Sequence, residues 1–196
     1  MTFCKRVQVA GIAGAVCVLA AGCIFNPGSG GGGGPTHKIL PRTSPENVVN
    51  NIAAVYELRD VTQYDSLLTD AYVFRFQEAD IRTGAPDSIG HAQEILFAEK
   101  LFVSGAGGEN PAASRITFSY TISAIGDDPR LGHTGWKRYT VQTTVKVGFS
   151  NGNEIEVNSP AEFYFKQDPE GSGLWRLAEW RDLPGGTGAP RLLALK

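Results

Sequence analysis

The chain has few cysteines, and none of them lies in the part that is expected to fold. Its 196 residues include three cysteines, Cys4, Cys17 and Cys23, all close to the amino terminus. A disulfide needs two thiols, and a thiolate nucleophile or metal ligand must belong to the folded domain. The absence of cysteine after residue 23 therefore excludes disulfides, cysteine catalysis and cysteine-ligated metals from the globular part.

Histidines and basic clusters are also scarce. The three histidines, His37, His91 and His133, are scattered and show neither the H-x-H nor the H-x-x-x-H spacing of a metal site. We therefore expect no metal and no cofactor. The formal net charge is −2, and no block of basic residues occurs. Nucleic acid is excluded as an expected partner because its binding needs a positively charged surface.

The first residues have the pattern of a secretion signal. Lys5 and Arg6 precede an apolar stretch over residues 7–21, and small residues lead to Cys23 in the sequence Leu-Ala-Ala-Gly-Cys. This segment resembles a bacterial lipobox. The resemblance implies diacylglycerol on Cys23, cleavage before it and acylation of the new amino terminus. The protein would then be held by lipid on the extracytoplasmic side of a membrane of the bacterial cell envelope.

One alternative for this segment is an uncleaved membrane helix. Residues 7–25 are 19 in number, and about 20 suffice to span a bilayer. The small residues before Cys23 and the glycine tract that follows favour processing. We predict a signal peptide over 1–22, a lipidated cysteine and glycine-rich tether over 23–43, a domain over 44–183 and a tail over 184–196. Without the signal peptide, 16 basic residues face 20 acidic ones.

Three helices are predicted in the domain. Ser44 is a suitable cap for a first helix with Pro45 at its first position, and Asp60 for a second helix that ends near Leu68. A third helix is predicted from Asp87 or Ser88 to about Val103. Its apolar stripe contains Ile89, Ala92, Ile95, Leu96, Ala98, Leu101 and Phe102.

Alternating apolar and polar residues predict five strands. They cover residues 71–77, 115–124, 138–149, 154–165 and 174–183. The third and fourth form a hairpin, and their apolar sets must share one face. A three-residue loop, 151–153, satisfies this condition with Val141 opposite Phe163 and Val147 near Val157. It requires Asn153 in the left-handed conformation. Pro160 predicts a bulge or an edge position in the fourth strand.

The order of these elements predicts an α+β fold with a strongly bent, mostly antiparallel sheet and three N-terminal helices on its concave face. Its sequence resembles the nuclear transport factor 2-like superfamily in the order and spacing of residues 44–60, 64–68, 72–74 and 174–183. The resemblance implies a cone-shaped domain whose sheet wraps a pocket. That superfamily includes ketosteroid isomerase, polyketide cyclases, and proteins without known catalysis, so the fold alone does not decide the function.

The apolar strand faces offer few groups for chemistry. No acid or base occurs on their regular parts, so no catalytic residue is predicted, and the only candidates are His91, Tyr139 and Tyr120. His91 lies four, seven and eleven residues before Ile95, Ala98 and Phe102 and borders the helix stripe. The residues expected to line a ligand pocket are Tyr56, Phe74, Phe102, Tyr120, Tyr139, Phe163 and Trp175.

Three functions remain open from the sequence. The first is a non-catalytic domain that binds a small apolar ligand or another envelope protein, with its lipid in the membrane. The second is a small enzyme of the isomerase, dehydratase or cyclase type that uses His91 with a tyrosine. The third is a structural protein with a filled core. A carboxylate or imidazole facing the interior would favour the enzyme. The sequence does not predict the oligomeric state.

Overall fold

The computed structural model describes residues 37–105 and 111–186. The predicted signal peptide, Cys23 and the glycine tract lie outside the described residues. None of the helices within those two ranges is long and apolar enough to cross a membrane.

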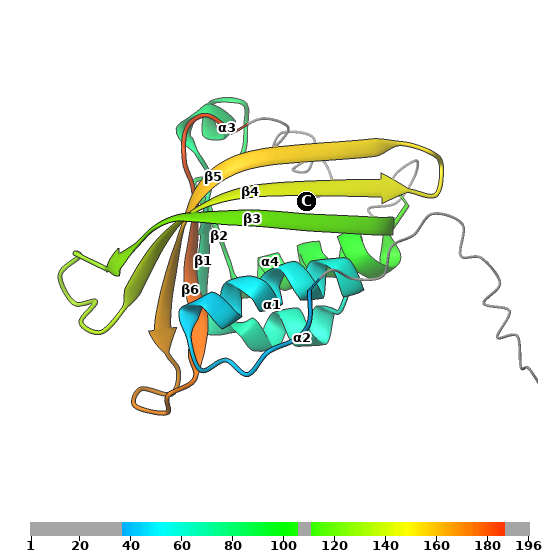
Figure 1. Ribbon diagram of the computed structural model, residues 1–196. Coiled ribbons are helices and arrows are strands. Elements are labelled where there is room, and N and C mark those ends of the chain that lie inside the picture. Colours follow the sequence, from blue (N-terminus) through cyan, green and yellow to red (C-terminus); the bar gives the residue numbers. More distant parts are fainter. Residues whose placement is uncertain (1–36, 106–110, 187–196) are drawn as a thin grey trace, which may run out of the picture. The chain divides into compact units, whose positions relative to one another are not determined.

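The described chain has its helices before residue 105 and four strands in succession after them, which is an α+β order, except that two further strands lie among the helices (Figure 1). The helices are α1 (Pro45–Leu58), α2 (Val61–Leu67), α3 (Glu78–Arg82), α4 (His91–Glu99) and the π-helix η1 (Lys100–Ser104). The strands are β1 (Leu68–Arg75), β2 (Ser88–Gly90), β3 (Ala113–Asp127), β4 (Lys137–Phe149), β5 (Glu154–Gln167) and β6 (Trp175–Asp182).

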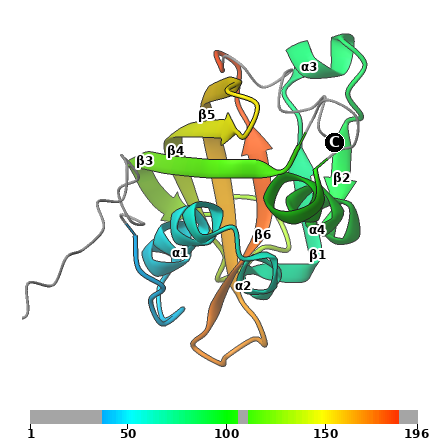
Figure 2. The same cartoon turned by 90° about the vertical axis from the view of Figure 1, so that its right-hand side faces the viewer.

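The strands form one bent sheet in the order β2-β1-β6-β5-β4-β3. Only β1 and β6, among the described pairs, run parallel. A register shift in β3 after Ile122 and another in β6 at Ala178, opposite Tyr164 and Phe165 of β5, let the sheet curve. Figures 1 and 2 show α1, α2 and α4 on the concave side of the sheet. The predicted fold class is confirmed.

The hairpin of β4 and β5 has the predicted faces but a different register. Val141 lies opposite Ala161, and Phe163 lies opposite Tyr139. The predicted pairs of Val141 with Phe163 and of Val147 with Val157 are therefore wrong by two residues. A shift of two residues keeps every side chain on its face, so the apolar alternation cannot detect it.

The turn explains this register. Four residues, Ser150 to Asn153, separate the strands, and Phe149 donates its amide to the Asn153 carbonyl. The left-handed residue is Gly152, with φ of 85°, rather than Asn153. Glycine adopts this conformation without steric cost because it has no Cβ.

The third predicted helix begins later than expected. Ser88–Gly90 form the edge strand β2, which pairs with Val73, Phe74 and Arg75 of β1, so α4 begins at His91. Its inward face also differs, because Leu96 is 51% exposed whereas Phe97 is 3% exposed. The short helix α3 was not predicted.

Residues 37–43, which we assigned to the tether, pack against the domain. Asn51, in α1 and almost fully buried, accepts a hydrogen bond from the Leu40 amide and donates one to the Leu40 carbonyl, each at 2.7 Å. Trp175 of β6 donates its backbone amide to the Arg42 carbonyl at 2.8 Å. The seven described residues before Ser44 thus belong to the packed domain.

An ionic network holds the β3–β4 loop on the convex face of the sheet. The Asp128 carboxylate, whose side chain is fully buried, accepts hydrogen bonds from the Arg130 guanidinium and lies 2.5 Å from Nδ1 of His133. Arg130 also donates to Glu179 of β6 at 2.7 Å and lies 3.8 Å from the centroid of the Tyr164 ring. Burial opposes ionisation of Asp128, but the Arg130 hydrogen bonds outweigh it and lower the pKa to about 2.

This shift predicts that acid weakens the domain. The ordinary pKa of an aspartate, 3.8, applies in the unfolded chain. Since the folded pKa is lower, the stabilisation by Asp128 is complete above about pH 4 and is lost as the pH falls toward 2. We expect Asp128→Asn to remove up to about 2 kcal/mol of the free energy of unfolding at pH 7 and to flatten this acid dependence. Urea denaturation at a series of pH values measures both.

Asp127→Asn is the matched control, because Asp127 is adjacent but largely exposed and pairs with Lys137 at the surface. Its removal should change stability by no more than about 0.5 kcal/mol. Equal acid profiles for the two variants would contradict the proposed role of Asp128.

Candidate functional site

A cluster of polar side chains lies inside the cone, between the helices and the sheet. Tyr56 comes from α1, Tyr64 from α2, Tyr72 from β1 and Glu94 from α4. All four are at most 5% exposed. Tyr72 points inward because it shares one face of β1 with the buried Phe74, and Glu94 because it lies one helical turn before Ala98.

The Tyr64–Glu94 pair is the centre of this cluster. The Tyr64 hydroxyl donates a hydrogen bond to Oε1 of Glu94 at 2.8 Å. Burial raises the pKa of Tyr64 well above its usual value, and the Glu94 carboxylate raises it further. The phenol therefore stays protonated and acts as a donor. The ring of Tyr56 lies edge-on to Tyr64, with 5.4 Å between the centroids.

Tyr72 brings an unused donor to the same region. Its hydroxyl is buried and has no hydrogen-bond partner among residues 37–105 and 111–186. The Tyr64 hydroxyl is close enough to lower the pKa of Tyr72 slightly, but burial and the Glu94 charge dominate and raise it. The contact with Tyr64 does not meet hydrogen-bond geometry, so the Tyr72 hydroxyl is unbonded among the described residues. A buried hydroxyl without a partner is unfavourable by about 1 to 3 kcal/mol.

A second carboxylate acts on the cluster from β6. Asp182 accepts a hydrogen bond from Nε1 of Trp180 at 3.0 Å. Its charge also contributes to the raised pKa values of Tyr56 and Tyr72, after the larger effects of burial and of Glu94. The interior thus combines tyrosine donors with carboxylates that can accept protons.

Aromatic rings form the wall beside these groups. The Trp180 ring centroid lies 4.4 Å from that of Phe163 and 5.8 Å from that of Phe74. Phe74 and its strand partner Ile89 are each 9% exposed and Trp180 is 7% exposed, whereas Phe163 is fully buried. The core is therefore less tightly covered near Phe74, Ile89 and Trp180 than it is at Phe163.

Four of the expected pocket residues lie in this interior. Tyr56 contacts Phe102 edge-on, with 5.1 Å between centroids, and Phe74 and Phe163 both contact Trp180. The structure thus brings together part of the predicted lining, from α1, β1, η1 and β5.

The remaining candidates lie elsewhere. Tyr139 is buried and donates to Glu46 at the start of α1, a contact that, after burial, raises the pKa of the tyrosine. Tyr120 is partly exposed and stacks on His37. Trp175 lines a separate hollow at the surface.

His91 is also outside the cluster. Its Nε2 lies 2.9 Å from Oδ1 of Asp65, a carboxylate that is 51% exposed. No hydrogen bond between His91 and Tyr120 or Tyr139 occurs in the described part of the chain. The structure therefore does not assemble the histidine–tyrosine pair.

Glu94 is the functional candidate that sequence reasoning missed. The expected absence of acids came from the strand faces, whereas Glu94 lies on a helix. A signal existed: Glu94 precedes Ala98, Leu101 and Phe102 by four, seven and eight residues, the spacing of one helical face. Within residues 37–105 and 111–186, no group of three or more metal-binding side chains occurs.

The unequal bonding of two tyrosines gives a test. Tyr64→Phe removes a hydrogen bond to a buried carboxylate and should lower the free energy of unfolding by about 1 to 3 kcal/mol. Tyr72→Phe removes a hydroxyl without a partner and should leave stability unchanged or raise it. Urea denaturation compares the two variants, and an equal loss in both would contradict this description of the cluster.

Comparisons with known proteins support the fold. No protein-family model matches the sequence, and no curated protein does either. A conserved protein from Planctomyces limnophilus is similar in structure, with a TM-score of 0.54 and 18% identity over 69% of this chain and 89% of its own. A putative aromatic ring hydroxylase from Novosphingobium aromaticivorans is also similar in structure, with a TM-score of 0.54 and 14% identity over 77% of this chain and 94% of its own.

A hexachlorocyclohexane dehydrochlorinase is also similar, with a TM-score of 0.50 and 7% identity over 72% of this chain and 84% of its own. At such low identity these likenesses show the fold and nothing finer. The described domain shares its bent α+β fold with these proteins.

Proposed function

We propose that this protein is a lipid-anchored domain of the bacterial envelope that binds a small, mainly apolar molecule inside its cone. The unbonded, buried hydroxyl of Tyr72 is the observation that supports ligand binding. A ligand carbonyl that accepts a hydrogen bond from this hydroxyl would supply the partner that it lacks within the described part of the chain. The rings of Phe74, Phe163 and Trp180 would contact the apolar part of the ligand.

A second candidate function is acid–base catalysis at the same place. Glu94 favours it, because this carboxylate is 2% exposed and lies among tyrosine donors. In this reading Glu94 removes a proton from the carbon beside a carbonyl, the electron pair moves to the carbonyl oxygen, and Tyr72 stabilises that oxygen by donation. The proton returns from Glu94 to carbon, so the reaction is an isomerisation or an exchange.

The anchoring part of the proposal depends on Cys23 in the lipobox-like sequence. Cys23→Ala should leave the precursor uncleaved and unlabelled by radioactive palmitate, whereas Cys17→Ala should be cleaved and labelled normally. Labelling in the Cys23 variant equal to that in the wild type would contradict lipid attachment at this residue.

Two probes of nearly equal shape test the binding part. Acetonaphthone carries a carbonyl oxygen where isopropylnaphthalene carries a methyl group. Only acetonaphthone can therefore accept a hydrogen bond from the Tyr72 hydroxyl. We expect calorimetry to show tighter binding of acetonaphthone by about five- to tenfold, as one net hydrogen bond allows. Tyr72→Phe should abolish this preference. Tyr164→Phe should keep it, because that tyrosine bonds Glu162 on the convex face.

Absence of binding of both probes, or a preference that survives Tyr72→Phe, would contradict the proposed binding mode. The same ketone separates the two functions, because its methyl protons exchange with deuterium when a base removes them. Exchange faster than in buffer and lost in Glu94→Gln would establish catalysis. Binding without such exchange would support the non-catalytic function.

A further inference from the structure

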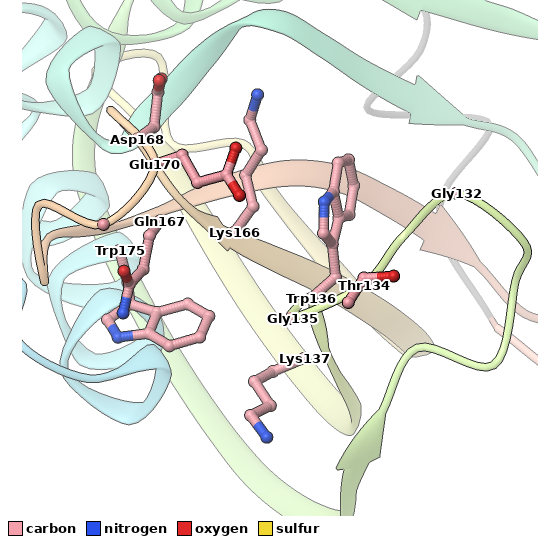
Figure 3. Close-up of a pocket in the computed structure, with 11 residues that line it drawn as sticks. Gly132, Thr134, Gly135, Trp136, Lys137, Lys166, Gln167, Asp168, Glu170 and Trp175 are labelled. Carbon is pink, nitrogen blue, oxygen red and sulfur yellow. The ribbon is translucent and has the colours of Figure 1, made fainter.

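A hollow of about 690 Å³ lies at the surface, at the end of the sheet opposite the β4–β5 turn. The β3–β4 loop and the β5–β6 turn form its two sides. Figure 3 shows the indoles of Trp136 and Trp175 on different sides of it, with Lys166 and Glu170 between them and Lys137 farther down. The lining of this hollow does not include Tyr72, Glu94 or the other residues of the cone interior.

The two indoles offer apolar surface that is only partly covered. Both tryptophans are partly exposed, and they come from different parts of the chain, one before β4 and one at the start of β6. Lys166 places its ammonium 5.8 Å from the centroid of the Trp136 ring. Flat apolar surfaces of this kind stack on flat ligand faces and fix their orientation.

The polar groups around the indoles are numerous but nearly balanced in charge. Lys137 pairs with Asp127, and Asp168 lies 3.5 Å from Arg176. Lys166 and Glu170 contribute one charge of each sign, and the Gln167 amide both donates and accepts. The hollow therefore presents many hydrogen-bonding atoms without a strong field of either sign.

The walls are held in place before any ligand arrives. In the β3–β4 loop, the Trp136 carbonyl accepts from the Asp128 amide at 3.1 Å, and the His133 ring lies against the indole with 4.2 Å between centroids. In the β5–β6 turn, the Asp168 amide donates to the Leu174 carbonyl at 2.9 Å. Such order reduces the entropy lost on binding.

These features select among ligand classes. A purely apolar ligand would remove water from ammonium and carboxylate groups without replacing it. A strongly charged ligand would meet groups of its own sign as well as the opposite sign. A neutral sugar ring has apolar C–H faces for the indoles and hydroxyls at its edge for the amide, ammonium and carboxylate groups.

We propose that the hollow between Trp136 and Trp175 is a binding site for a neutral oligosaccharide. The sugar rings pack on the indoles, and their hydroxyls bond Gln167, Lys166 and Glu170. This site is separate from the cone, so it stands whether or not the cone binds a ligand.

The experiment titrates the intact protein with cellotetraose, maltotetraose and tetra-N-acetylchitotetraose and follows tryptophan fluorescence. At least one of these tetrasaccharides should bind with a dissociation constant of about 1 mM or below, near −4 kcal/mol. Trp136→Ala and Trp175→Ala should each weaken that binding by about tenfold or more. Thr134→Arg, at the exposed rim, should weaken it similarly by occupying the hollow without removing core contacts.

Leu131→Ser is the matched control, because Leu131 is in the same loop, fully exposed and not part of the lining. It should bind as the wild type does. If a tryptophan variant does not fold, Thr134→Arg still decides the result. Failure of all three tetrasaccharides to bind, unchanged binding in Thr134→Arg, or tighter binding of tetragalacturonate or choline would overturn the proposal.

Discussion

The long hairpin of β4 and β5 must keep one apolar face against the helices along 13 and 14 residues, respectively. A straight strand of that length, about 45 Å at 3.3 Å per residue, would extend beyond the edge of a compact core. The sheet therefore curves, with a register shift after Tyr164. This curvature creates the cone and also brings the ends of the strands together at the opposite edge, so both proposed sites depend on it.

Burial of the polar cluster is the second feature that shapes the interior. A carboxylate in an apolar core is unfavourable unless hydrogen bonds compensate for lost water. The Tyr64–Glu94 bond gives such compensation and ties α2 to α4. Most buried polar groups have a hydrogen-bond partner, and the Tyr72 hydroxyl is an exception among the described residues. Such exceptions are expected at sites that bind a ligand.

The convex face performs a different task. Arg130 joins Asp128 of the loop to Glu179 of β6 and covers the Tyr164 ring. These contacts fold the β3–β4 loop back on the sheet and hold the chain that leads to Trp136. The geometry of the hollow between Trp136 and Trp175 is thus coupled to an ionic network on the opposite face of the sheet from the cone interior.

The sequence by itself determined α1, α2, the alternation of the long strands and the α+β class, because these follow from local periodicity and capping, but it did not predict α3 or the start of α4 at His91. It left the hairpin register open by two residues, since alternation has a period of two. It placed Glu94 on one helical face with Ala98, Leu101 and Phe102, but whether that face is buried depends on what packs against it. Only the tertiary structure decided that Glu94 meets Tyr64, that His91 faces Asp65, and that Trp136 and Trp175 share one hollow. Those contacts join residues 26 to 39 positions apart, which only the path of the folded chain brings together.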